Sequence, residues 1–176
     1  IGLLFWYLEL DLDKYTTIIR LNDRGIFSGL YKFQGEYKVR GDIRTAELFP
    51  QEYSQVWKTK KKKREVKIIF ENNKISKLIL HPEEKEVARI QYFNLVNYKD
   101  PLSSFLNILI NNSPSKTIDG RRTYTLSPDI NLKKNKILIN NYSNIWADHK
   151  RKDLEYIEVF ANKDVSLLPS KIKIRF

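Results

Sequence analysis

Alternation of apolar and polar side chains is the feature of this sequence that most constrains its fold. The stretch "YLELDLD" puts leucines on one face of an extended chain and carboxylates on the other, namely Leu8, Leu10 and Leu12 against Glu9, Asp11 and Asp13. A period of two is typical of a half-buried antiparallel strand. The same period recurs along most of the chain, so the sequence predicts a mainly β protein.

Turn signals divide the alternating stretches into hairpins. The first strand is expected to return through Asp13-Lys14, and Asn72-Asn73 forms a turn in which both residues can take positive φ. Asp119-Gly120 predicts a type I′ turn. The stretch "GLYKFQGEYKVRGDIR" reads as two short strands broken at Gln34-Gly35.

One segment has helical periodicity instead. In "DPLSSFLNILINN" Asp100 suits an N-cap and Pro101 the first helical position, and Asn111-Asn112 with Pro114 ends the helix. The apolar residues recur at spacings of three and four and form one stripe: Leu102, Phe105, Leu106, Leu109 and Ile110. We therefore expect one helix over residues 101–111.

About ten strands and one helix predict a single domain over residues 1–176. The expected architecture is an antiparallel β-barrel or a strongly curved sheet around the helix, because closure removes exposed sheet edges. An edge strand missing at either end would leave the barrel open.

Composition excludes several classes of site. The 176 residues include no cysteine, so disulfides and thiolate metal sites are excluded. No stretch of about 18 apolar residues occurs, so we expect no transmembrane segment, although peripheral membrane contact is compatible with the sequence. No glycine-rich phosphate loop occurs either, which disfavours a nucleotide enzyme.

Several phrases, in order, resemble the exported bacterial family known as domain of unknown function 3108. They are "YTTIIRLNDRGIFSGLYKFQGEYKVRGDI", "LFPQEYSQVWKTKKKKREVKIIFENNKI", "DPLSSFLNIL", "DGRRTYTLS" and "LLPSKIKIRF". The matching positions are Gly25 or Gly29, Gly41, Pro50, Tyr53, Arg64, Asp100, Ser103, Asp119, Gly120, Arg121 and Pro169. The resemblance implies a periplasmic or cell-envelope location, a signal peptide that was removed or lies outside this sequence, a β-barrel-like fold and no established reaction.

Catalytic and metal-binding patterns are weak. His81 lies among acidic residues and His149 follows Asp148, but neither shows the spacing of metal ligands, so we expect no metal and no cofactor. Asp11 and Asp13 form the best carboxylate pair for glycoside hydrolysis, and we interpret them as a polar strand face.

Aromatic residues on the alternating strands are expected to fill the interior or to line an apolar pocket for a lipid or glycan. The candidate ligand-binding residues are Tyr31, Phe33, Trp57, Phe70 and Phe105.

The most basic segment of a chain with net charge +11 is "WKTKKKKREVKIIF". Six cations fall within positions 58–64 of this segment: Lys58, Lys60, Lys61, Lys62, Lys63 and Arg64. Because Val66, Ile68 and Phe70 alternate behind them, we interpret Lys60 to Lys63 as the solvated tip of a hairpin. The same cations predict contact with an anionic surface, or with nucleic acid, which the envelope location disfavours.

Together these features predict a non-catalytic envelope protein that binds an apolar or amphipathic ligand, with lipid, lipoprotein or cell-wall polymer as partners. Two alternatives stay open. One is a polyanion or nucleic-acid binding module that uses Lys58 to Arg64. The other is a hydrolase of envelope glycans.

Overall fold

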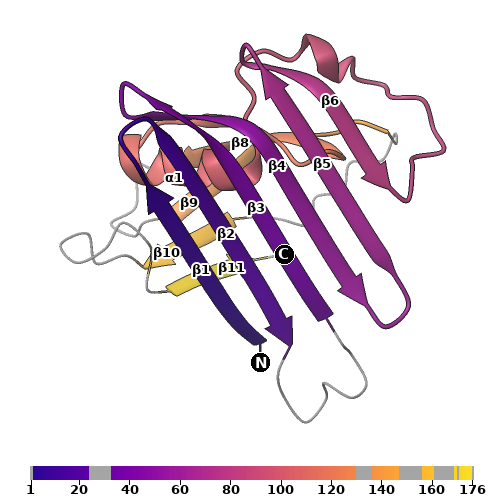
Figure 1. The fold of residues 1–176 in the computed structure, drawn as a ribbon, viewed down its shortest axis with the longest axis horizontal. Coiled ribbons are helices and arrows are strands. Elements are labelled where there is room, and N and C mark those ends of the chain that lie inside the picture. Colours follow the sequence, from indigo (N-terminus) through magenta and orange to yellow (C-terminus); the bar gives the residue numbers. More distant parts are fainter. Residues whose placement is uncertain are drawn as a thin grey trace.

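Two antiparallel sheets make up most of the structure, a computed structural model that describes residues 2–23, 33–129, 136–146, 156–160, 169 and 171–175. The first sheet is a six-stranded meander of β1 (Gly2–Leu10), β2 (Lys14–Asp23), β3 (Phe33–Arg44), β4 (Glu47–Thr59), β5 (Lys63–Glu71) and β6 (Lys74–His81) (Figure 1). The second, in the order β11-β10-β9-β8-β7, contains β7 (Ser115–Ile118), β8 (Arg122–Pro128), β9 (Lys136–Asn144), β10 (Tyr156–Phe160) and β11 (Lys171–Arg175).

The predicted helix is confirmed with its boundaries. Helix α1 spans Pro101–Asn111, and the Asp100 carboxylate caps it by accepting hydrogen bonds from the backbone N–H groups of Leu102 and Ser103. The helix ends at Asn112, whose φ of 49° places it in the left-handed region. A 3₁₀-helix, η1 (Tyr92–Asn94), lies in the segment that joins β6 to α1.

Helix α1 packs against β3 and β4 of the first sheet and against β7 and β8 of the second, and it lies behind the first sheet in Figure 1. Leu102 and Leu106 belong to the core cluster of the first sheet, while Phe105 and Ile108 belong to the cluster of the second. Trp6 of β1 joins the two clusters, since its ring centroid lies 5.6 Å from that of Phe105. The helix is therefore apolar on more than the one predicted stripe.

The β-barrel half of the fold prediction is not confirmed. In the described part of the chain both sheets are open, with β1 and β6 as the edges of the first sheet and β7 and β11 as the edges of the second. The sheets are layered around α1 rather than closed on themselves, because the helix supplies apolar surface to both.

Some local predictions were wrong for identifiable reasons. Residues 33–44 form one strand through Gln34-Gly35, because neighbouring strands pair with it on both sides. The β7–β8 turn is centred on Gly120 and Arg121, and only Gly120 has positive φ, so it is not a type I′ turn at Asp119-Gly120. Asn72 and Asn73 both have positive φ, as predicted.

Candidate functional site

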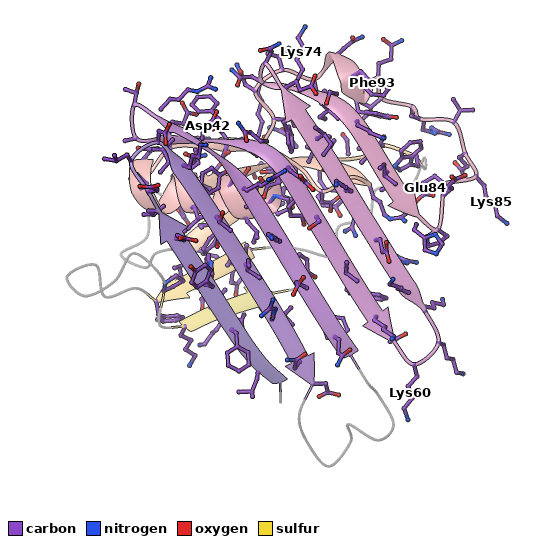
Figure 2. The ribbon with its side chains drawn as sticks, viewed as in Figure 1. Asp42, Lys60, Lys74, Glu84, Lys85 and Phe93 are labelled. Atoms are coloured by element: carbon purple, nitrogen blue, oxygen red, sulfur yellow. The ribbon has the colours of Figure 1, made fainter. Side chains whose placement is uncertain are left out.

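The lysine run forms the predicted hairpin tip. Residues 60–62 join β4 to β5, and the turn is closed by hydrogen bonds from the backbone N–H of Thr59 to the Lys62 carbonyl and from the N–H of Lys62 to the Thr59 hydroxyl. Figure 2 shows Lys60 pointing away from this end of the sheet, with Lys74 at the opposite end. We call residues 58–64 the basic turn.

Most cations of the basic turn have no acidic partner. The Lys63 ammonium forms an ion pair with Glu65, but within the described residues no salt bridge involves Lys58, Lys60, Lys61 or Lys62. Their side chains are exposed to solvent. The basic turn therefore presents a local excess of positive charge that an anionic partner can neutralise.

The aromatic residues next to the basic turn lie on the inner face of the sheet. The rings of Phe33 and Trp57 meet edge to face with centroids 5.7 Å apart. The guanidinium carbon of Arg64 lies 5.7 Å from the centroid of Trp57, within the range of a cation–π contact. Strand alternation places Trp57 on the same face as Tyr53, yet Tyr53 is fully buried and Trp57 only half-buried.

A continuous row of side chains crosses five strands at this end of the inner face. Strand pairing joins Leu4 to Leu21, Leu21 to Gly35, Gly35 to Trp57 and Trp57 to Arg64. We call these five residues the end row. It starts with exposed leucine, since Leu4 is 49% exposed, and finishes at a cation. Gly35 contributes no side chain, and the rings of Phe33 and Tyr37 lie over it, 3.4 Å and 3.3 Å from where a Cβ would be.

A hollow of about 320 Å³ opens beside the end row. It is lined by Leu3, Leu4, Leu21, Asn22, Asp23 and Phe33. This lining is mainly apolar, with Asn22 and Asp23 at the end of β2. An apolar hollow next to a cationic turn is a suitable place for a ligand with one hydrophobic and one anionic part.

The five predicted ligand-binding residues do not come together. Phe33 and Trp57 are in contact, but Phe70 is 5% exposed in the core of the first sheet and Phe105 is 7% exposed against the second. Tyr31 lies outside the described residues. Alternation placed Phe33, Trp57 and Phe70 on the inner face of their strands, but it did not predict their place along the strand or their exposure.

A second hollow, of about 480 Å³, lies on the outer face near the other end of β3, β4 and β5. Its lining includes Asp42, Arg44 and Glu52, and these three side chains are held in ion pairs. Arg44 bridges to Asp42, and both Arg40 and Lys67 bridge to Glu52. The hydrogen bonds from Lys67 and Arg40 lower the pKa of the Glu52 carboxyl below its usual value. These cations are therefore less available to an outside anion than those of the basic turn.

Comparisons with models of protein families, with curated proteins and with solved structures find no match to this chain. The resemblance to domain of unknown function 3108 therefore stays a prediction.

The histidines offer no metal centre in the part of the chain that the structure describes. His81 is exposed at the end of β6, and no three His, Cys, Asp or Glu side chains gather there or at any other described position to hold a metal ion. His149 and Asp148 lie outside the described residues. No helix among the described residues is long and apolar enough to cross a membrane.

Sequence reasoning missed a buried polar cluster at the start of α1. The Ser103 hydroxyl donates to the Asp100 carboxylate, and the Tyr15 hydroxyl lies 2.6 Å from Ser103 Oγ. All three side chains are almost completely buried. Because a substrate has no access to them, we interpret the cluster as a structural connection between β2 and α1. No periodicity distinguishes such serines from solvent-facing ones.

Proposed function

We propose that this protein is a non-catalytic binding protein of the bacterial cell envelope, and that it holds an anionic amphipathic lipid at the end row. The observation that carries the proposal is the order of chemistry along that row. Apolar Leu4 and Leu21 beside the hollow are followed by the Phe33–Trp57 pair, then by Arg64 and the basic turn. A lipid has the same order, from hydrocarbon to charged head group.

The magnitudes favour an anionic lipid over a zwitterionic one. Each buried methylene of an acyl chain contributes about 0.8 kcal/mol, and each Lys or Arg near an anionic surface contributes about 1 kcal/mol. Three unpaired lysines at positions 60–62 therefore contribute a few kcal/mol, enough for a clear preference for anionic over zwitterionic lipid. This electrostatic part is expected to weaken with salt.

The proposal places the ligand at the end of the sheet rather than in a closed interior. Between the sheets, Leu106 is fully buried in one core cluster and Phe105 almost fully buried in the other, so α1 occupies that space. A ligand seated among them would have to displace the helix. The half-buried Phe33 and Trp57 need no such displacement.

Matched variants test the proposal that an anionic lipid binds at the end row. We expect Lys60→Ser/Lys61→Ser/Lys62→Ser to weaken binding of lysophosphatidylglycerol at least tenfold while binding of lysophosphatidylcholine changes little. Trp57→Ala should weaken binding of both lipids, because it removes apolar contact rather than charge. Native mass spectrometry and titration of intrinsic fluorescence measure the two affinities.

A control removes the same charge elsewhere. Lys74, Lys77 and Lys85 are exposed and lie away from the basic turn, with Lys74 and Lys85 visible in Figure 2. The variant Lys74→Ser/Lys77→Ser/Lys85→Ser should keep the affinity for lysophosphatidylglycerol. An equal loss in both triple variants would mean that only net charge matters, and would contradict a site at the end row.

The two alternatives make different predictions. A polyanion module would bind single-stranded DNA with a steep salt dependence and in preference to lipid. A hydrolase needs two free carboxyl groups across a cleft, whereas Asp42 and Glu52, which line the second hollow, are each held in salt bridges. We therefore favour lipid binding.

A further inference from the structure

Three of the four sheet edges carry features that block further strand pairing. At β6 the following segment folds back, with a bridge between Lys74 and Val96. At β7 the chain before α1 pairs with the strand through Lys99 and Thr117. At β11 the exposed lysines Lys171 and Lys173 are of the kind that discourages edge pairing.

Strand β1 is the exception. It lies at the left edge of the first sheet in Figure 1 and pairs only with β2 among the described residues. Its nine residues contain a single charge, at Glu9. Large apolar side chains are exposed on both of its faces, with Leu4 at 49% and Leu10 at 50% on one, and Phe5 at 55% and Tyr7 at 53% on the other. A long apolar edge with a single charge is a template for another strand.

The charge distribution favours a second copy of this chain as the occupant. Residues 2–23 contain four acids and two bases, a net charge of −2 in a chain of +11. The rest of the chain carries the positive excess, and the basic turn within it joins β4 to β5, away from β1. Two copies that meet at β1 therefore keep their basic turns apart, although each chain as a whole is strongly basic.

The sequence of β1 is also compatible with pairing to itself. In an antiparallel pair centred on Trp6, Phe5 faces Tyr7 of the second copy and Leu4 faces Leu8, twice each by symmetry. Glu9 faces Leu3, so no like charges are opposed. Aromatic pairs directly opposite each other are among the stabilising cross-strand contacts.

We propose that this chain forms a two-fold dimer in which β1 pairs antiparallel with β1 of a second copy, centred on Trp6. The first sheets of the two copies then form one continuous sheet. Pairing satisfies the unpaired N–H and C=O groups of both edges and shields Phe5 and Tyr7 from water. Phe5 and Tyr7, whose substitution tests the dimer, do not line the apolar hollow, although Leu3 and Leu4 of the same strand do.

Charged substitutions test the interface. We expect the wild-type chain to have twice the monomer mass in size-exclusion chromatography with light scattering, and Phe5→Lys/Tyr7→Lys to have the monomer mass. The control is Ile79→Lys on β6, an exposed apolar position at the opposite edge, which should stay dimeric. Circular dichroism verifies that each variant is folded. A monomeric wild type, or a dimer that survives Phe5→Lys/Tyr7→Lys, would overturn the proposal.

Disulfide trapping tests the register, and the absence of native cysteine makes the result simple to read. Directly opposed strand residues have the Cα separation that a disulfide needs. A mixture of the Phe5→Cys and Tyr7→Cys proteins should form cross-linked dimers on oxidation, and each variant alone should form far fewer. Cross-linking of either variant alone as readily as of the mixture would overturn the pairing centred on Trp6.

Discussion

Replacing Gly41 by alanine is expected to destabilise the protein by about 3 kcal/mol or more, or to prevent folding. A Cβ atom at this position would lie 2.1 Å from the carbonyl oxygen of Phe49 and 2.8 Å from Cα of Pro50. Both are backbone atoms of the paired strand, so neither can move without disturbing β4. Gly41 lies at a β-bulge, where the register between β3 and β4 shifts.

The same glycine allows Tyr15 to reach the helix. The Tyr15 ring would lie 2.8 Å from an added Cβ, and its hydroxyl contacts Ser103 of α1. Losing this close approach would disturb β2, β3 and the start of α1 together, which is why we expect a large effect. Urea unfolding followed by circular dichroism measures the change in the free energy of unfolding.

Gly35 of the same strand is the matched control. An added Cβ there would lie 3.3 Å from the Tyr37 ring and 3.4 Å from the Phe33 ring, and ring edges can shift. We expect Gly35→Ala to change the free energy of unfolding by no more than about 1 kcal/mol. The cost of shifting the rings is offset because alanine has less conformational freedom than glycine in the unfolded chain. Equal effects at the two glycines would contradict the proposed role of backbone contact at Gly41.

The stability of the protein is expected to fall as pH rises through the titration of Asp100. Burial raises the pKa of this carboxyl from 3.8 to about 6, against the opposing effect of hydrogen bonds from Ser103 and the backbone. Between these values the folded state binds a proton that the unfolded state has released, so the free energy of unfolding decreases with increasing pH. A difference of about two pH units corresponds to about 3 kcal/mol.

Two substitutions distinguish the effect of the Asp100 cap on stability from the effect of its ionisation. Asp100→Asn keeps an acceptor for the N–H groups of Leu102 and Ser103 but cannot ionise. Its free energy of unfolding should therefore increase by about 3 kcal/mol relative to wild type as pH rises from 3.8 to above about 6. Asp100→Ala removes the cap at any pH and should cost about 2 kcal/mol or more.

Comparing each variant with wild type at the same pH cancels the contributions of the other titrating groups to the free energy of unfolding. These include Asp119, whose pKa is also raised by burial, and Glu52, whose pKa is lowered. If the difference in unfolding free energy between Asp100→Asn and wild type is the same at every pH, Asp100 does not titrate as the structure indicates.

Local patterns predicted much of the fold. Period-two alternation placed Val66, Ile68 and Phe70 on the inner face, and all three are buried. The cap and stop signals located α1 at Pro101–Asn111. These predictions succeeded because strand faces and helix ends depend on neighbouring residues in the chain. The description of residues 60–63 as a hairpin tip succeeded for the same reason, since residues 60–62 form the turn and Lys63 begins β5.

The candidate site was less predictable. Of the predicted aromatic residues, Phe33 and Trp57 are in contact, whereas Phe70 and Phe105 lie in two different core clusters. Leu12 continues the alternation of β1 and yet is 98% exposed, because the strand ends at Leu10 and Leu12 belongs to the turn. Alternation predicts a face but not which part of that face is covered.

The sequence by itself determined the mainly β class, the helix and the cationic hairpin tip, because each depends on residues close together in the chain. Only the tertiary structure decided that the strands form two open sheets, that α1 is buried against both, and that Ser103 and Asp100 are fully buried. It also decided that Leu4 and Arg64 end one row across five strands. Such contacts join residues far apart in sequence, and their formation depends on how whole elements pack rather than on any local pattern.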